Sequence, residues 1–256
     1  YDRHFTICEQ LGIKMVTVPM TSTGPDMDAV EAAIKADSSI KGLWCVPKYS
    51  NPTGVVYSDE TVDRIAKLGK IASTNFRVFW DNAYSVHDLI DNAPQLSSIQ
   101  EATRRNGTED SVIQFASTSK ITQAGAGVAF VAASAANLAG FKKALGAQTI
   151  GPDKVNQIRH TRFLPDRGAL MAHMQKHAAL LNPRFEAVLS ALASAFEGTD
   201  LGAWEKPVGG YFVSFDTRKN CAKETVRLAA EAGVKLTPAG APYPYGKDPE
   251  DRNIRI

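Results

Sequence analysis

The stretch VFWDNAY, residues 78–84, decides the fold prediction because an apolar run ends there on an acid and a tyrosine three positions apart. The run Val78-Phe79-Trp80 is typical of a buried strand. Asp81 and Tyr84 follow it directly. A simple turn also accepts Asp81-Asn82, so the stretch gains meaning only from the segments on either side of it.

Apolar runs and helical patterns alternate around this stretch. Gly42 to Val46 is continuously apolar, which predicts a strand covered on both faces. Ser58 is placed to cap a helix with acids in its first turn. The expected strands are 15–18, 42–46, 78–80, 112–116 and 128–132, and the expected helices are 26–36 and 59–73. This order predicts an α/β fold, with a mostly parallel sheet flanked by helices and joined by right-handed crossovers.

The pattern changes from about residue 166 onward. Long helices are expected at 167–181 and 184–196, then a half-buried strand at 209–215, a helix at 222–232 and a strand at 234–237. We therefore place a domain change near Pro183, with a partial large domain at 1–182 and a smaller, truncated α+β domain at 183–256. The chain has no initiator Met, and NIRI at 253–256 looks like an interrupted strand, so we expect a fragment of a longer protein.

Composition narrows the function classes. The 256 residues include 29 Lys and Arg against 27 Asp and Glu, so net charge gives no reason to expect nucleic acid or a membrane surface as partner. The stretch from Val128 to Phe141 is too short to span a bilayer. Cys8, Cys45 and Cys221 form no CxxC pair, so we expect neither a zinc site nor a disulfide framework, and a reducing cytoplasm as the location. The polar N-terminus does not resemble a signal peptide.

Polar groups follow three successive strands of the expected sheet. Asn51 lies in NPTG after the first, Asp81 and Tyr84 follow the second, and STSK at 117–120, ending in Lys120, follows the third. Ligand groups in α/β sheets gather at the carboxyl ends of strands. Each group also has a simpler interpretation, since NPTG fits a type I turn and a lone Ser-Lys is commonly a surface feature. The ordered set is what indicates a shared site.

The ordered series NPTG, DNAY and STSK resembles the large domain of class I/II aminotransferases, the fold type I pyridoxal-phosphate enzymes. PVGGYF at 207–212 and NIRI at 253–256 are similar to small-domain motifs of the same family. Within the family, KYSNPTG, WDNAY and LTPAGAPYP most resemble a bacterial aspartate aminotransferase subfamily.

The resemblance implies a role for each residue of the series. Asp81 corresponds to the carboxylate that faces the pyridine nitrogen and keeps it protonated. Tyr84 and Asn51 correspond to donors for the phenolic oxygen of pyridoxal 5'-phosphate. Lys120 corresponds to the Schiff-base lysine, which also shuttles the proton in transamination.

The phosphate and the substrate carboxylate need further groups. Ser117 matches a phosphate ligand of the family, and Ser119 is a weaker candidate. Many members carry an arginine eight residues after the lysine, where this chain has Val128, so backbone N–H groups, hydroxyls or an upstream segment must serve instead. Arg255 resembles the arginine that binds the substrate α-carboxylate. The aromatic residue that stacks on the ring lies upstream in the family, unless it is Tyr1.

A second substrate carboxylate would require another cation. The candidates in GPDKVNQIRHTRF are Lys154, Arg159, His160 and Arg162, and a solvated basic helix face is an equally good interpretation of them.

The resemblance implies an aminotransferase that moves an amino group from an L-amino acid, with aspartate expected, to a 2-oxo acid, with 2-oxoglutarate expected. It also implies ping-pong kinetics and a homodimer, with no metal. Two alternatives stay open at this point: a lyase or decarboxylase on the same fold, and the ligand-sensing, aminotransferase-like domain of a transcription regulator.

Overall fold

The computed structural model describes residues 2–256, and Tyr1, the alternative stacking aromatic, lies outside the described residues. The chain begins with α1 (Asp2–Gln10), followed by the two-stranded antiparallel ladder of β1 (Met20–Thr21) and β2 (Gly24–Pro25). The strand expected at 15–18 is wrong, since residues 13–19 have no regular secondary structure. The Met15 N–H donates instead to the hydroxyl of Tyr245 at 2.8 Å, so a side chain takes the place of a neighbouring strand.

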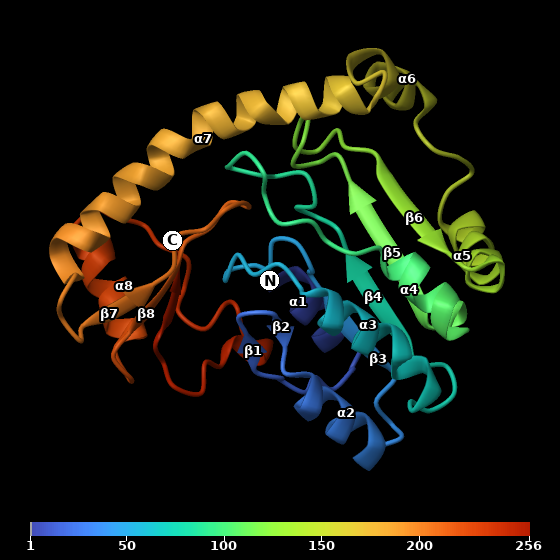
Figure 1. Cartoon of the computed structure of the whole chain (residues 1–256), viewed down its shortest axis with the longest axis horizontal. Helices are drawn as coiled ribbons and strands as arrows, with labels where there is room; N and C mark the ends of the chain where they lie inside the picture. Colours follow the sequence, from blue (N-terminus) through green and yellow to red (C-terminus); the bar gives the residue numbers. More distant parts are fainter. Residues whose placement is uncertain (1) are drawn as a thin grey trace.

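A four-stranded sheet forms the centre of the larger part of the molecule (Figure 1). Its strands are β3 (Gly42–Cys45), β4 (Arg77–Asp81), β5 (Val112–Ser117) and β6 (Ala129–Ala133), in the order β3-β4-β5-β6. The pairs β3–β4 and β4–β5 are parallel, and β6 runs antiparallel to β5. The predicted fold class, a mostly parallel sheet flanked by helices, is confirmed.

Three helices pack on one face of this sheet. They are α2 (Met27–Ala36), α3 (Asp59–Lys67, continued by the 3₁₀ turn η1, Leu68–Lys70) and α4 (Ile99–Asn106). Side-chain oxygens of Asp26, Ser58 and Ser98 accept the first free N–H groups of these helices. Their apolar faces meet the sheet in a core that includes Ile34, Val62, Ile65, Leu68, Val78, Trp80, Ile99 and Val112. Burial of this continuous apolar layer fixes the sheet against its helices.

The opposite face of the sheet carries a row of aromatic rings. Trp44 stacks on Phe79 with ring centroids 5.3 Å apart, and Phe79 stacks on Phe115 at 5.9 Å. Trp44 remains 36% exposed, whereas its neighbour Cys45 is buried. The expectation that β3 is covered on both faces is therefore wrong for the part of the chain that the structure describes, because an apolar run does not reveal which layer covers it.

The helix α7 (Arg167–Phe196) spans the molecule from the region of α5 (Ala135–Gln148) and α6 (Lys154–Phe163) to the second sheet (Figure 1). The expected interruption at Pro183 is wrong, since one helix runs through it. Proline removes one backbone hydrogen bond, but Phe185 and Leu189 pack in the second core, and Asn182 donates to the carbonyl of Leu89 at 2.9 Å. The domain limit at 182/183 stays a prediction.

The second, antiparallel sheet contains β7 (Gly202–Trp204), β8 (Ser214–Thr217) and β9 (Asn253–Arg255), packed against α7 and α8 (Ala222–Glu231). The short 3₁₀ turns η2 (Glu109–Ser111) and η3 (Pro244–Gly246) complete the list of elements. No strand forms at 234–237, where the Val234 N–H closes the end of α8 by donating to Ala229. Within residues 2–256, each helix is too short or too polar to cross a bilayer.

The strand expected at 209–215 begins only at Ser214. The backbone of the preceding segment pairs with the loop after β4 instead: the Leu89 N–H donates to Val208 at 3.0 Å, and the Gly210 N–H donates to His87 at 2.9 Å. This pairing joins the second sheet to the edge of the first at the ends of the parallel strands.

Candidate active site

The three strand-end segments meet at the carboxyl edge of the large sheet. The amide nitrogen of Asn51 donates to the hydroxyl of Tyr84 at 3.3 Å. The Nζ atom of Lys120 lies 5.0 Å from the centroid of the Tyr84 ring. From the second sheet, Arg255 donates to the amide oxygen of Asn51 at 3.2 Å. Arg255, Asn51, Tyr84 and Lys120 thus form one continuous row of contacts between the two sheets.

Asp81 ends β4 beside this row. Together with Ala83 and Lys120 it lines a cavity of about 440 Å³, which also reaches Ser117 and Ser119. Burial raises the pKa of the Asp81 carboxyl, while a contact from Trp44, the charge of Lys120 and the Ala83 N–H act in the opposite direction. A half-buried carboxylate and an amine at one cavity form a pair of groups suited to a charged, planar ligand.

The STSK turn forms the floor of the cavity with its hydroxyls. The oxygens of Ser117 and Ser119 lie 2.8 Å apart, and the Ser119 N–H donates to Ser117 at 3.0 Å. Gly127 packs so closely on Ser119 that a Cβ atom built there would overlap the Ser119 hydroxyl. The chain carries no Lys or Arg from residue 121 to 140, so besides Lys120 the donors that this turn can offer to an anion are hydroxyl and backbone N–H groups.

The basic residues that the sequence suggested for a second carboxylate lie on α6, away from the lining of the cavity. Lys154, Arg159 and Arg162 are exposed on α6, and none of them lines the cavity. His160 instead anchors the STSK turn, because its Nε2 lies 2.9 Å from the hydroxyls of both Thr118 and Thr122. Its Nδ1 lies 2.8 Å from the carbonyl of Asn156, which requires the proton on Nδ1 and leaves Nε2 as the acceptor.

Arg255 reaches the row of contacts from β9. Its guanidinium lies 4.9 Å from the ring centroid of Phe212, in a cation–π geometry. The guanidinium is therefore held between an aromatic face and the Asn51 amide, at the junction of the two sheets. A planar fork with five N–H donors in this place can bind a carboxylate through two hydrogen bonds.

The sequence analysis missed a buried cluster behind this junction. Lys48, only 5% exposed at its side chain, forms an ion pair with Asp88 at 3.0 Å, and the Tyr49 hydroxyl donates to the same carboxylate at 2.8 Å. Burial, assisted by the Asp88 charge, raises the pKa of Tyr49. The cluster joins the segment before NPTG to the loop after DNAY. The sequence gives no signal for this contact, because the acid and the lysine are forty positions apart.

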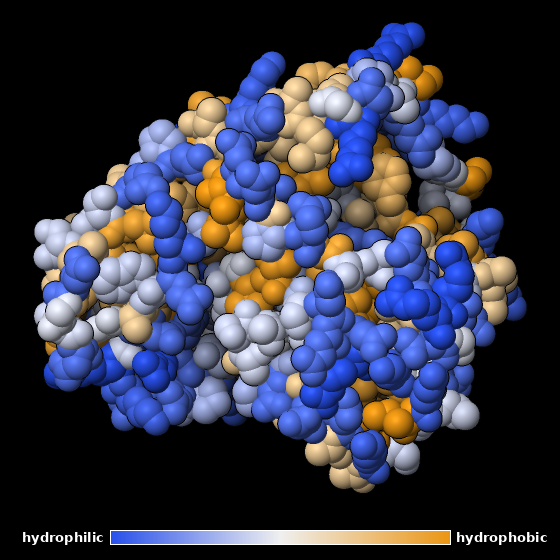
Figure 2. Space-filling model, in the orientation of Figure 1, coloured by the Kyte–Doolittle hydropathy of each residue, from blue (hydrophilic) through white to orange (hydrophobic). Residues whose placement is uncertain are grey.

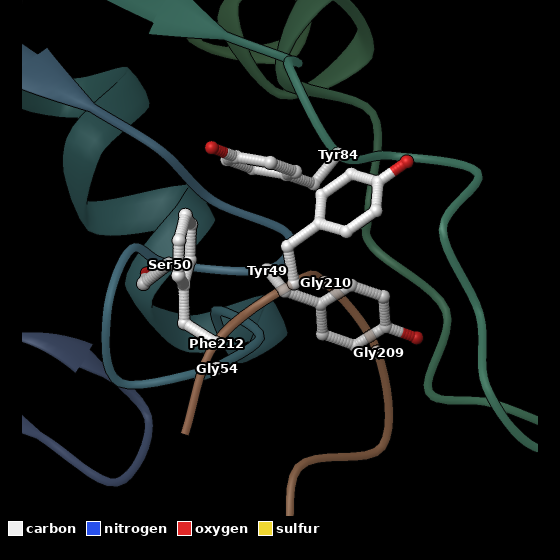
Figure 3. Close-up of a pocket in the computed structure, with 8 residues that line it drawn as sticks. Tyr49, Ser50, Gly54, Tyr84, Gly209, Gly210 and Phe212 are labelled. Atoms are coloured by element: carbon white, nitrogen blue, oxygen red, sulfur yellow. The ribbon is translucent and has the colours of Figure 1, made fainter. Parts of the chain in front are cut away.

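The backbone of Gly209 lies very close to the ring of Tyr49 at this junction. Figure 3 shows the side chains of Tyr49, Tyr84 and Phe212 around a small pocket at the segment that carries Gly209 and Gly210. A Cβ atom on Gly209 would fall within the Tyr49 ring, and Gly210 has a positive φ of 84°. The GG pair is a sequence signal for close backbone approach that the sequence analysis did not use, since it placed both glycines in a strand.

Comparison with known proteins gives the class and then the family. The sheet and its flanking helices have the fold type I architecture of the aminotransferases, which is the fold of the solved structures that the chain matches. The chain belongs to the aspartate amino-transferase family, whose sequence model matches residues 1–256.

Individual relatives agree with this assignment. The chain is 47% identical to a Mycolicibacterium smegmatis protein named as an aminotransferase and 44% identical to the aspartate aminotransferase of Corynebacterium glutamicum, over all of its 256 residues. It covers 60% and 59% of those two proteins, so the chain spans about three fifths of their length.

Two crystal structures extend the comparison. An aspartate transaminase from C. glutamicum matches with a TM-score of 0.96 and 44% identity, over 100% of this chain and 60% of that one. An α-aminoadipate aminotransferase from Thermus thermophilus, complexed with N-(5'-phosphopyridoxyl)-L-leucine, matches with a TM-score of 0.80 and 25% identity, over 96% and 60%.

The close approach at Gly209 generates a first prediction. We expect Gly209→Ala to destabilise the protein by about 1–3 kcal/mol, because the added methyl group must displace the Tyr49 ring. Urea unfolding would measure the loss. The matched control is Gly146→Ala in α5, where nothing lies within 4 Å of the added Cβ and a gain of up to about 1 kcal/mol is expected. Equal effects of the two substitutions would contradict the packing described above.

The raised pKa of Asp81 generates a second prediction. A carboxyl with a raised folded-state pKa opposes folding once it ionises, so its stability contribution falls as pH rises above the unfolded value of 3.8. We expect Asp81→Asn to raise the thermal midpoint of the cofactor-free protein at pH 7, and to raise it less at pH 4.

The control for this prediction is Asp37→Asn. Hydrogen bonds from Ser39 lower the pKa of the Asp37 carboxyl, so removing that charge should lower the midpoint at pH 7. A fall in the midpoint of Asp81→Asn at pH 7 would contradict the electrostatic account of the site.

Proposed function

We propose that the protein is a pyridoxal-phosphate-dependent aminotransferase that moves an amino group from an L-amino acid to a 2-oxo acid by a ping-pong mechanism. The observation that carries the proposal is the row from Arg255 through Asn51 and Tyr84 to Lys120, beside the Asp81 cavity. The site therefore combines a carboxylate-binding group, hydroxyl and amide donors, an amine and an acid. These are the groups that amino-acid chemistry on this cofactor requires.

The residues fit the cofactor by their chemistry. When bound, pyridoxal phosphate supplies the electron sink for reactions at the substrate α-carbon. Asp81 would accept a hydrogen bond from the protonated ring nitrogen, and its half-buried position strengthens this charge-assisted bond. Tyr84 and Asn51 would donate to the phenolic oxygen. Lys120 would hold the cofactor covalently and afterwards move the proton at the α-carbon as a free amine.

The phosphate group is assigned to the STSK turn. Ser117 and Ser119 would donate their hydroxyls, with backbone N–H groups of the turn as further donors. Gly127 supports this assignment, because a side chain at this position would overlap the Ser119 hydroxyl. Val128 lies at the position of the absent arginine, so Lys120, which is assigned to the covalent bond with the cofactor, would be the one cation of the turn near the anion.

The amino donor we propose is aspartate, with 2-oxoglutarate as acceptor. Arg255 would bind the α-carboxylate that both substrates share. The relative from C. glutamicum, which is named an aspartate aminotransferase, supports the choice of substrate. The cation for the second carboxylate is expected from outside the cavity lining, since the basic residues of α6 do not reach it.

We further propose a homodimer in the cytoplasm. The helices α5 and α6 contain no buried residue, although Val155, Ile158 and Phe163 are apolar and more than half exposed. A second copy of the chain would cover these side chains and could supply the missing cation. Light scattering of the full-length protein should give twice the chain mass, and a monomeric mass would refute the dimer.

Covalent attachment of the cofactor is the direct test of the proposed function. We expect the full-length protein to gain one phosphopyridoxyl group on Lys120 after incubation with pyridoxal phosphate and borohydride, as measured by mass spectrometry. Lys120→Ala should lose the modification, whereas the control Lys35→Ala, which removes an exposed lysine on α2, should keep it. Attachment to both variants, or to neither, would refute the proposal.

Amino transfer itself is tested with the Arg255→Lys variant. We expect 2-oxoglutarate-dependent formation of oxaloacetate from aspartate, and an increase of roughly tenfold or more in KM when the bidentate guanidinium is replaced by an ammonium group. The effect should appear for both substrates, because both present an α-carboxylate. Release of ammonia or carbon dioxide without 2-oxoglutarate would indicate a lyase or decarboxylase instead.

A further inference from the structure

The backbone carbonyl of Lys120 is bound by two side chains that have no part in the proposed function. The Nε2 atom of His87 lies 3.0 Å from this oxygen. The hydroxyl of Tyr211 donates to the same oxygen at 2.9 Å. Two donors thus converge on one acceptor in the peptide unit that carries the reactive amine.

The chemistry of the contact fixes the protonation state of His87. A carbonyl oxygen only accepts hydrogen bonds, so Nε2 must carry the proton and donate. Among the described residues, Nδ1 of His87 has no hydrogen-bond partner. The side chain is only 3% exposed, and this burial lowers the pKa of the ring. His87 therefore donates from Nε2 to the Lys120 carbonyl in a fixed orientation.

The two donors are held by aromatic contacts with each other and with the site. The rings of His87 and Tyr211 meet edge to face with centroids 5.0 Å apart, and both meet the ring of Tyr84, at 5.8 and 6.0 Å. Offset and edge-to-face contacts of this kind are favourable. The donors cannot turn away from the carbonyl without also disturbing Tyr84.

Tyr211 also connects the lysine to the carboxylate-binding arginine. Its neighbour Phe212 lies under the guanidinium of Arg255 at 4.9 Å. The Gly210 N–H donates to the carbonyl of His87 at 2.9 Å, so the segment that carries Tyr211 is attached to the loop that carries His87. One dipeptide, Tyr211-Phe212, therefore contacts both the backbone of Lys120 and the head group of Arg255.

We propose that His87 and Tyr211 are positioning residues that hold the main chain of Lys120, and that Tyr211-Phe212 couples the position of this lysine to that of Arg255. The inference rests on the proposed function, in which Lys120 binds the cofactor. The Nζ atom is attached through four methylene groups, so the direction in which it can reach depends on how well its peptide unit is fixed. Precise placement of a reacting group is a large source of rate in enzymes.

The turn itself does not depend on the two donors. The next carbonyl, of Ile121, lies 2.7 Å from Nε2 of His173 on α7, and Thr118 is bound to His160. Removal of a donor to Lys120 should therefore loosen this one peptide unit and leave the turn folded, so the variants are informative.

The test compares the rate of cofactor attachment to Lys120 in the full-length protein, trapped by borohydride and followed by mass spectrometry. Tyr211→Phe and His87→Met each remove one donor and should slow attachment about fivefold, the equivalent of one neutral hydrogen bond. His87→Gln retains an N–H donor and should stay closer to the wild type than His87→Met. The control Tyr245→Phe removes a hydroxyl bound to a distant backbone N–H and should not change the rate.

A second measurement uses the cofactor-free protein. The N–H groups of Ile121 and Thr122 donate to the carbonyl of Thr118 within the turn, and their hydrogen exchange should quicken about fivefold in Tyr211→Phe and His87→Met. If the wild type gains no cofactor, the proposed function fails and exchange alone decides the positioning role. If Tyr211→Phe and His87→Met both attach the cofactor and exchange these protons at the rates of the wild type, the inference is overturned.

Discussion

Parallel pairing of β3, β4 and β5 brings three chain segments to one edge of the sheet, and the rest of the site depends on this. The register sets Cys45 opposite Trp80 and Asp81 opposite Phe115. The residues that follow these strands leave the sheet in the same direction. A shift of one residue in β4 would turn Asp81 to the opposite, helix-covered face of the sheet, so packing of Val78 and Trp80 in the core also determines where the carboxylate lies.

The second sheet is joined to the first through polar as well as apolar contacts. Backbone hydrogen bonds join residues 208–210 to residues 87–89, and the Lys48–Asp88 pair is buried directly behind them. Burying an ion pair costs desolvation energy that its attraction only partly offsets. The pair is better understood as a device that fixes geometry, since the Tyr49 hydroxyl and the Lys48 ammonium leave the Asp88 carboxylate little freedom. The face drawn in Figure 2 is mostly hydrophilic, with apolar side chains showing between the polar ones.

The sequence predicted local features and missed those that depend on distant partners. The strands near 42–46 and 78–80 and the cap at Ser58 follow from apolar runs and capping chemistry. The ordered motifs also selected the segments that meet at the sheet edge. The strand at 15–18 and the full strand at 209–215 were wrong because their backbone groups bond to other segments. Helix α7 continues through Pro183 because contacts on both sides of it outweigh one lost hydrogen bond. The contacts of Lys48, His87 and Tyr211 involve residues that are far apart in the chain.

The features that cost folding free energy are gathered where the proposed chemistry occurs. Asp81 is a carboxylate whose surroundings disfavour its charge. That burden becomes an advantage when a positively charged ring nitrogen binds, because the attraction is then exerted at a carboxylate already partly removed from water. Lys120 lies on the same cavity, and its charge lowers the pKa of the Asp81 carboxyl, which partly offsets the effect of burial. An apolar residue in place of Asp81 would fold more readily but would leave a bound pyridinium without its counter-charge, so the proposed binding accounts for an acid at this position where stability does not.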